Sequence, residues 1–156
     1  MRHTENQSSK SAFNKLIQYC NYRERSSREI EIKLLNLAYS EKEIVSAIQK
    51  GKDLGIVDNN RFAKSFARGK NRKNRWGKNR IRFELKVKGL NTKEIEFGIS
   101  NINEEDYKES LIKCITIYKK KSKTFQEFKL VKYLNFKHFE TADFIKFRSI
   151  NFNNFP

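Results

Sequence analysis

The sequence predicts an all-α protein in which three tandem three-helix repeats stack into an elongated, curved array. Three observations predict this fold. The 156 residues include only six glycines and a single proline, Pro156, so few positions force a helix to end. Helix start signals recur along the chain. One segment in the first third of the sequence returns, in changed form, further along.

Four short polar residues are each followed three positions later by glutamate, which is the pattern of a capping box. In such a box the polar side chain accepts a hydrogen bond from the third helical N–H, and the glutamate reaches back to the capping residue. Asp58 and Asn103 are predicted to cap two further helices. The four capping-box pairs are Ser26–Glu29, Ser40–Glu43, Asn91–Glu94 and Thr124–Glu127.

Residues 81–88, I-R-F-E-L-K-V-K, alternate apolar and polar side chains, which is typical of a strand. A helix would split the same apolar residues between two faces, so periodicity alone does not decide. The flanking residues favour a helix, because Gly89 suits a helix C-terminus and the next capping box begins at Asn91. We therefore expect a helix in this segment.

An internal repeat organises the chain. Residues 27–44 match residues 78–95 with a shift of 51, and a weaker third copy lies at 134–144. The same apolar positions recur in the copies, so each copy is expected to build the same small core. These positions are Ile30 and Ile81; Leu34, Leu85 and Leu134; Tyr39, Leu90 and Phe139; and Ile44, Ile95 and Phe144.

Each copy follows a longer predicted helix, at 11–24, 59–75 and 104–121. A unit of about 50 residues buries its apolar face poorly alone, so neighbouring units are expected to stack. We therefore divide the chain into a disordered leader and three three-helix repeats. The boundaries are 1–10 for the leader and 11–56, 57–102 and 103–156 for the repeats.

The formal net charge of +16 predicts a partner that neutralises it, because such an excess repels itself in a compact chain. Nucleic acid is the most common partner of this kind, and an anionic membrane surface is the alternative. A surface tuned only for solubility is a third interpretation. The sequence shows no signal peptide and no apolar run of spanning length, so we expect a cytoplasmic protein.

No constellation of residues predicts an active site, a metal site or a cofactor, and we expect a binding protein rather than an enzyme. His3 lies in the predicted leader, and His138 takes the repeat position of Gly89. Cys20 and Cys114 stand apart in apolar helical patterns and are interpreted as small buried residues in a reducing compartment. The acidic cluster is interpreted as stabilising a helix N-terminus and consists of Glu104, Glu105 and Asp106.

The strongest functional signal is the basic segment 61–88, which holds twelve Lys and Arg residues against one acid, Glu84, for a net charge of +11. On a helix, five cations between 61 and 75 recur at three- and four-residue steps. They form a stripe whose internal repulsion a phosphate backbone would remove. A merely solvated basic face is the alternative. The candidate nucleic-acid-binding cations of the segment are Arg61, Lys64, Arg68, Arg72, Arg75, Lys78, Arg80, Arg82 and Lys86.

Trp76 lies at the end of this stripe and has two interpretations. Its ring can stack on an exposed base, a contact worth roughly 1–3 kcal/mol. Alternatively, it can close the core at a corner between two helices, and the sequence favours this second interpretation.

Three segments resemble the RecX family of regulatory proteins. They are Y-C-N-Y-R-E-R-S-S-R-E-I-E-I-K-L at 19–34, G-I-V-D-N-N-R-F-A-K-S-F-A-R at 55–68 and G-K-N-R-I-R-F-E-L-K-V-K-G-L at 77–90. The resemblance covers residues 11–100 and continues less clearly in the third repeat. There the family's basic Arg-Arg-Gly-aromatic turn is replaced by F-K-H-F at 136–139. RecX-like proteins are built from tandem three-helix repeats, in agreement with the repeat found above.

The resemblance implies a partner, the RecA recombinase assembled on single-stranded DNA, with double-stranded DNA as a further ligand. Family members bind in the filament groove and hinder filament extension, ATP hydrolysis, strand exchange and stimulated repressor cleavage. We expect this chain to act as a monomer. Its D-N-N-R-F-A at 58–63 matches the family's D-D-x-R-F-A, with Asn59 replacing the second acid. Arg23 and Arg25 lie at the corner between the first two helices, where they face the partner or compensate a helix C-terminus.

Two other functions remain as alternatives. The first is a sequence-tolerant nucleic-acid binder with no recombinase partner, since basic three-helix units can bind a phosphate backbone unaided. The second is a helix-turn-helix transcription regulator, which needs a recognition helix with polar base-reading side chains. The basic segment is nearly pure Lys and Arg, and such residues position a protein on DNA without specifying a sequence.

Overall fold

The structure is a computed structural model that describes residues 5–122, 124 and 126–150, with side chains for 12–122, 124 and 126–149. All regular secondary structure in these residues is helical, which confirms the predicted fold class. None of the described helices combines the length and the apolar character that crossing a membrane requires. The helices are α1 (Glu5–Cys20), α2 (Ser27–Leu35), α3 (Glu41–Asp53), α4 (Asn59–Asn74), α5 (Lys78–Val87), α6 (Thr92–Ser100), α7 (Glu104–Lys121), α8 (Glu127–Phe136) and α9 (Thr141–Ile150).

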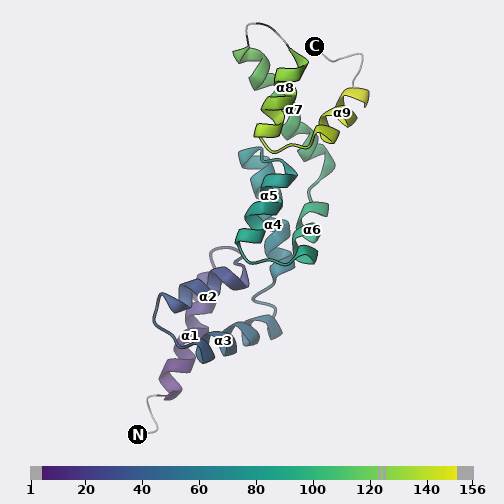
Figure 1. The fold of residues 1–156 in the computed structure, drawn as a ribbon. Helices are drawn as coiled ribbons and strands as arrows, with labels where there is room; N and C mark the ends of the chain where they lie inside the picture. The colour runs from purple at the N-terminus through teal and green to yellow at the C-terminus, as the bar shows by residue number, and fades with distance from the viewer. Residues whose placement is uncertain (1–4, 123, 125, 151–156) are drawn as a thin grey trace.

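The helices form three consecutive groups of three, α1–α3, α4–α6 and α7–α9, stacked along one long axis (Figure 1). The elongated array of tandem three-helix repeats is therefore confirmed. Within the first two groups the long helix packs against both shorter ones, and α4 also contacts α7 of the next group. Helix α1 begins at Glu5, earlier than the expected start at residue 11, and so overlaps the predicted leader; residues 1–4 lie outside the described residues.

The predicted repeat positions are equivalent in the structure. The second helix of each group buries two aliphatic side chains four residues apart, which are at most 1% exposed. The turn that follows this helix contains a residue with positive φ in all three groups, namely Ala38, Gly89 and His138. His138 therefore lies at the position of Gly89, as the sequence predicts. The buried pairs are Ile30 and Leu34 in α2, Ile81 and Leu85 in α5, and Leu130 and Leu134 in α8.

Local capping signals set most helix starts. Three predicted capping boxes, in α2, α3 and α6, have both of their hydrogen bonds. Asp58 caps α4 and Asn103 caps α7, as predicted. The ambiguous segment 81–88 belongs to helix α5 and its C-cap, so the helix prediction is confirmed.

The fourth predicted capping box, Thr124–Glu127, is wrong. Helix α8 begins at Glu127 with Gln126 as its N-cap, and Gln126 makes no side-chain capping bond. Glu127 is then the first helical residue, too early in the helix to reach back to Thr124. Its carboxylate instead forms an ion pair with Arg148 of α9. An ion pair between two helices has therefore replaced the predicted capping contact of Glu127 with Thr124.

The described residues bury two separate hydrophobic cores. One belongs to the first repeat alone and includes Leu16, Ile30 and Leu34. The other runs without interruption from Phe62 of α4 to Phe144 of α9 and thus joins the second and third repeats. Repeats 2 and 3 therefore form one packed unit, whereas repeat 1 packs around its own centre.

The junction between repeats 2 and 3 is tight at the backbone level. The Gly77 N–H donates a 3.3 Å hydrogen bond to the carbonyl oxygen of Lys137, which connects the turn before α5 to the turn after α8. A Cβ atom at Gly77 would lie 2.0 Å from the carbonyl oxygen of His138. Buried Ser110 of α7 also donates to the carbonyl oxygen of Asn71 in α4, at 3.0 Å.

Both cysteines of the chain are free thiols in the structure. Cys114 is buried in the shared core of repeats 2 and 3, as expected, and Cys20 is half-buried beside the core of repeat 1. Burial raises the pKa of both thiols. Each side chain therefore behaves as a small apolar group at neutral pH.

Candidate nucleic-acid interface

Helix α4 carries four cations of the predicted stripe, but the fifth, Arg75, is its C-cap in a left-handed conformation, so the helix ends before the stripe does. It buries Phe62, Ala63 and Ala67 against α6 and α7, and this anchors the helix. Arg68 and Arg75 are exposed and Lys64 is half-buried; none of the three forms an ion pair with a residue that the structure describes. These three side chains are therefore available to an external anion.

Other cations of the basic segment form ion pairs that connect neighbouring repeats. Arg61 Nε lies 2.6 Å from Glu24 of repeat 1, and the hydrogen bond that it donates to the Glu24 carboxylate raises the pKa of the Arg61 guanidinium. Arg72 Nε lies 2.7 Å from Asp106 of α7, at the start of repeat 3. These arginines are exposed, at 44% and 65%, and so could still meet a ligand, but their charges already have an internal partner.

Arg82 of α5 is the most extensively paired of these cations. Its Nε lies 2.8 Å from Glu96 of α6, and one terminal nitrogen lies 2.8 Å from Glu140, just before α9. The same terminal nitrogen also donates to Asn79. Arg82 thus binds repeat 2 to repeat 3. The acidic partners are distant in sequence, so charge patterning alone offered no sign of these contacts.

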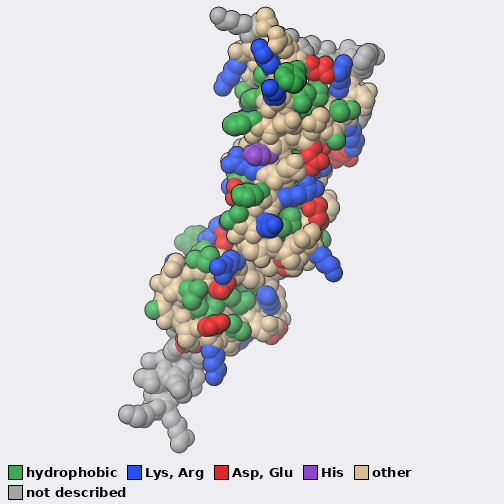
Figure 2. All heavy atoms as spheres, viewed as in Figure 1, with side chains coloured by type: hydrophobic (Ala, Val, Ile, Leu, Met, Phe, Trp, Pro, Cys, Tyr) green, Lys and Arg blue, Asp and Glu red, His purple; other side chains and the backbone are tan. Residues whose placement is uncertain are grey.

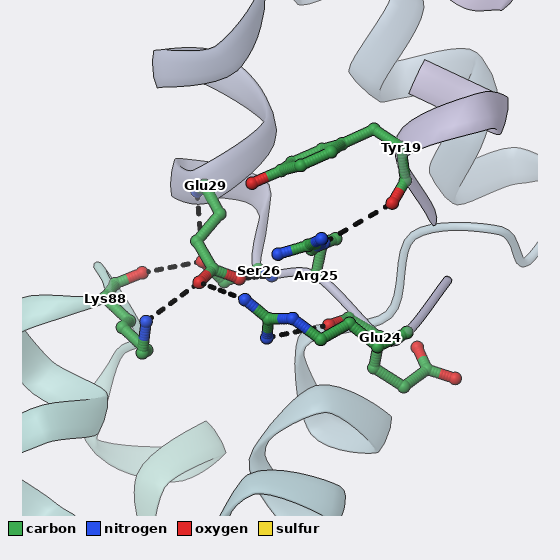
Figure 3. Close-up of polar contacts among 7 residues, drawn as sticks. Tyr19, Glu24, Arg25, Ser26, Glu29 and Lys88 are labelled. Atoms are coloured by element: carbon green, nitrogen blue, oxygen red, sulfur yellow. Dashed lines mark hydrogen bonds and ion pairs between the residues drawn. The ribbon is translucent and has the colours of Figure 1, made fainter. Parts of the chain in front are cut away.

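The corner between α1 and α2 is a polar junction between repeats 1 and 2 (Figure 3). The Glu29 carboxylate accepts hydrogen bonds from Lys88 of α5's C-cap at 2.8 Å and from Arg23 at 3.3 Å. The buried Ser26 hydroxyl, which also caps α2, donates to the carbonyl oxygen of Lys88 at 3.0 Å. Arg23 is therefore engaged within the chain.

Arg25 is also engaged within the chain. Its guanidinium lies 3.9 Å from the centre of the Tyr19 ring, and its Nε donates to the carbonyl oxygen of Tyr19 at 3.3 Å (Figure 3). Tyr19 is in the last turn of α1, where unpaired carbonyl groups favour a cation. Of the two interpretations of Arg25, its position supports compensation of the helix C-terminus.

Glu29 makes the stability of this junction pH-dependent. Burial acts to raise the pKa of its carboxyl group, but hydrogen bonds from Lys88 and the Ser26 N–H, with the charges of Lys88 and Arg23, lower it below the ordinary value of 4.5. A carboxyl group with a lowered folded-state pKa stabilises the fold above its unfolded-state pKa, and this contribution is lost as the pH falls through the folded-state value.

We expect Glu29→Gln to lower the free energy of unfolding by about 1 kcal/mol at pH 7. Glutamine can still cap α2 through its amide oxygen, but it removes the charge and replaces one of the two acceptor oxygens, which meet the Ser26 N–H and Lys88, by an NH2 group. The difference from the wild-type protein should shrink as the pH falls below about 4.5. Urea unfolding of both proteins at several pH values measures it. A difference that stays constant over the pH range would contradict the assigned ion pairs.

Trp76 closes the core of repeat 2 and is covered by cations. Its half-buried ring packs against Phe66, with ring centres 6.4 Å apart. The Arg80 guanidinium lies 4.1 Å from the ring centre and Lys70 Nζ lies 4.8 Å from it. The structure supports the core interpretation of Trp76, with Arg80 held above the ring.

The remaining two candidates lie on opposite ends of α5. Lys86 is exposed and forms no ion pair with the described residues. Lys78 lies 4.5 Å from the centre of the Tyr107 ring, at a cleft between α6, α7 and α9. Burial and the 2.7 Å hydrogen bond that Tyr107 donates to Asp143 both raise the pKa of Tyr107. This cleft contains charges of both signs and does not resemble a phosphate site.

The chain matches two family descriptions in chain order. Residues 12–50 match the first three-helix domain of RecX, and residues 58–96 match its second three-helix domain. Together these matches cover half of the chain. They include helices α2, α4 and α5 completely.

Three relatives of the chain are named Regulatory protein RecX. The protein of Chlorobium phaeobacteroides (strain BS1) is 34% identical over 92 residues, which are 59% of this chain and 61% of the relative. That of Prosthecochloris aestuarii is 33% identical over 79 residues, 51% of this chain and 52% of the relative. The protein of Bacillus subtilis (strain 168) is 26% identical over 114 residues, which are 73% of this chain and 43% of the relative. The chain thus spans less than two thirds of the length of each.

Two crystal structures of RecX proteins share the fold. RecX from Lactobacillus salivarius has a TM-score of 0.78 at 22% identity, covering 92% of this chain and 96% of that one. A second RecX structure has a TM-score of 0.76 at 20% identity, and the match covers 91% of this chain and 73% of that one. These likenesses extend the shared fold to the third repeat. The two matched three-helix domains and the named relatives show that the chain belongs to the RecX family of regulatory proteins.

Proposed function

We propose that this protein binds the RecA filament on single-stranded DNA and restrains its ATP hydrolysis, strand exchange and extension. Family membership supports this function, and the structure adds the observation that carries it. On an elongated stack of repeats, α4 and its C-cap residue carry Lys64, Arg68 and Arg75 without internal ion-pair partners among the described residues. Helix α4 has 16 residues and is therefore about 24 Å long. An elongated body with an unpaired basic row suits a long, negatively charged assembly.

The protein would act by occupying the filament rather than by catalysis. Ion pairs with the DNA backbone would supply affinity, and contacts with successive RecA subunits would supply specificity. We propose that it works as a monomer in the cytoplasm. Its effect on RecA would then depend on how many filament sites one molecule blocks.

The test is RecA's single-stranded-DNA-dependent ATP hydrolysis, measured while this protein is added at substoichiometric ratios to RecA with DNA in excess. We expect inhibition well below one molecule per RecA, because one bound molecule hinders extension of a whole filament. If hydrolysis is unaffected, or falls only when the protein is abundant enough to coat the DNA, the proposed function is wrong.

The second candidate is a sequence-nonspecific nucleic-acid binder with no recombinase partner. The unpaired cations of α4 favour it equally, since they need only phosphates. Simple backbone binding should weaken steeply with salt, with a log–log slope of about −0.7 for each phosphate contact on a single strand. Binding to RecA filaments should depend less on salt, because protein contacts share the affinity. A common slope for bare DNA and for filaments would favour this second candidate.

A further inference from the structure

The outward side of helix α8 carries aromatic rings and cations in alternation. Phe128, Lys132 and Phe136 recur at four-residue steps and so lie along one side of the helix; we call these three residues the outer row of α8. The opposite side buries Leu130 and Leu134 in the shared core, which fixes the orientation of the row. Phe128 is 68% exposed and Phe136 is 75% exposed. Rings this exposed contribute little to the core and are accessible to a ligand.

Cations accompany each ring of the outer row. Lys132 Nζ lies 4.5 Å from the centre of the Phe128 ring, and Lys137 Nζ lies 5.8 Å from the centre of the Phe136 ring. Neither lysine forms an ion pair with a described residue. The one acid on α8, Glu127, is paired with Arg148 of α9. This side of the helix is therefore both apolar and positively charged.

The outer row is continuous with the basic end of α4. The Gly77 N–H bonds to the Lys137 carbonyl oxygen, so the turn that ends α4 lies against the turn that ends α8. Arg75 and Lys137 both lie close enough to buried Cys114 for their charges to counteract the burial that raises its pKa. Over α5 and α8, Figure 2 shows hydrophobic side chains interspersed with Lys and Arg. The unpaired cations thus extend from repeat 2 into repeat 3.

We propose that the outer row of α8 is a base-stacking site for single-stranded nucleic acid, with the Phe128 and Phe136 rings against bases and Lys132, Lys137 and Arg75 against the phosphates. Stacking on an aromatic ring accepts any base, because every base has a π-face. Duplex DNA keeps those faces inside its stack, so the row selects unpaired strands. An apolar groove on a partner protein suits this surface less well. Binding there would bury the unpaired cations without an anion to pair with them, which costs free energy.

The spacing of the rings fits a nucleic-acid strand. Phe136 follows Phe128 by eight helical positions, which is about 12 Å along the axis. Stacked nucleotides follow one another at about 3.4 Å, so two bases a few nucleotides apart on one strand reach both rings. Lys132 then lies beside the intervening phosphates. This site deepens the proposed function, on which it rests only in taking single-stranded DNA as a ligand.

The experiment compares the full-length protein with Phe128→Ala/Phe136→Ala, using a labelled oligothymidylate and an abasic strand of the same length. We expect the double variant to bind oligothymidylate at least about thirtyfold more weakly, since two base stacks are lost. Its affinity for the abasic strand should equal that of the wild-type protein, because the phosphate contacts remain. Both rings are largely exposed, so unchanged thermal melting is expected and serves as the folding control.

Phe83→Ala provides a matched control. Phe83 occupies the outward side of α5, is 65% exposed and has no cation over its ring among the described residues. This variant should bind both strands as the wild-type protein does. If the double variant keeps wild-type affinity for oligothymidylate, or loses equal affinity for both strands, the base-stacking assignment is overturned.

The RecA assay separates this inference from the proposed function. If wild-type protein inhibits RecA while the double variant keeps its affinity for oligothymidylate, the proposed function stands and the stacking site is overturned. If in addition that variant no longer inhibits RecA, the outer row binds protein instead. If wild-type protein fails to inhibit RecA but the double variant loses base-dependent binding, the stacking site is supported and the recombinase partner is wrong.

Discussion

Replacement of Gly77 by alanine is expected to destabilise the protein by about 3 kcal/mol, with a fall in melting temperature on the order of 10 °C. The new Cβ would lie 2.0 Å from the His138 carbonyl oxygen and 2.4 Å from the Phe139 nitrogen. Both are backbone atoms, so no side-chain rotation relieves the clash. The two turns must move apart, and the hydrogen bond from Gly77 to Lys137 is lost with them. Thermal unfolding followed by circular dichroism measures the change.

Gly69→Ala is the matched control for this substitution. Gly69 lies inside α4, and an added Cβ there meets nothing within 4 Å. Alanine in an open helical position stabilises a protein by roughly 0.5–1 kcal/mol, because the unfolded chain loses freedom. The two Gly→Ala changes should therefore shift the melting temperature in opposite directions. Equal effects from both would mean that the junction between repeats 2 and 3 is not packed as described.

Replacement of Lys64, Arg68 and Arg75 by glutamine is expected to lower affinity for single-stranded DNA about a hundredfold near 0.1 M salt. Each cation that contacts a phosphate contributes about 0.7 to the log–log salt slope, so the slope should also flatten by about 2. Glutamine retains much of the aliphatic stem, which preserves the packing of α4 and its C-cap. Fluorescence anisotropy with a labelled oligonucleotide at several salt concentrations measures both quantities.

The paired arginines provide the comparison for that variant. Arg61, Arg72 and Arg82 belong to the same basic segment but already have carboxylate partners. Their replacement by glutamine should change the salt slope less and lower the free energy of unfolding more. The distinction between free and paired cations is incorrect if both triple variants lose DNA affinity to the same degree.

The fold was predictable because its determinants are local or periodic. Capping residues such as Ser26 and Asn91 act within one helical turn, and buried positions such as Ile30 and Ile81 recur with the repeat. The same reasoning failed at Thr124, where a local signal competed with an ion pair between Glu127 and a residue on another helix. Local patterns lose their predictive value where a contact between helices supplies more stabilisation.

The sequence identifies the basic segment, but not which of its cations are paired within the fold. The run of cations marks α4 and α5 clearly, because charge is a property of the sequence itself. Which cations are neutralised depends on Glu24, Asp106 and Glu140, and these approach only when the repeats stack. The outer row of α8 was missed for a different reason. Two phenylalanines at helical spacing look the same in sequence whether they face the core or the solvent.

Because the molecule has two separate cores, its stiffness should differ along the stack of repeats. Repeats 2 and 3 share one core and should behave as one stiff unit of six helices. Repeat 1 folds around its own core and is joined to repeat 2 by the short segment before α4 and by mainly polar contacts. Polar contacts at a surface weaken with ionic strength, and apolar ones do not. The junction between repeats 1 and 2 is therefore expected to open before the junction between repeats 2 and 3. If the proposed filament is the partner, this junction would let the stack of repeats follow the filament's helical twist without disturbing repeats 2 and 3, which hold the unpaired cations.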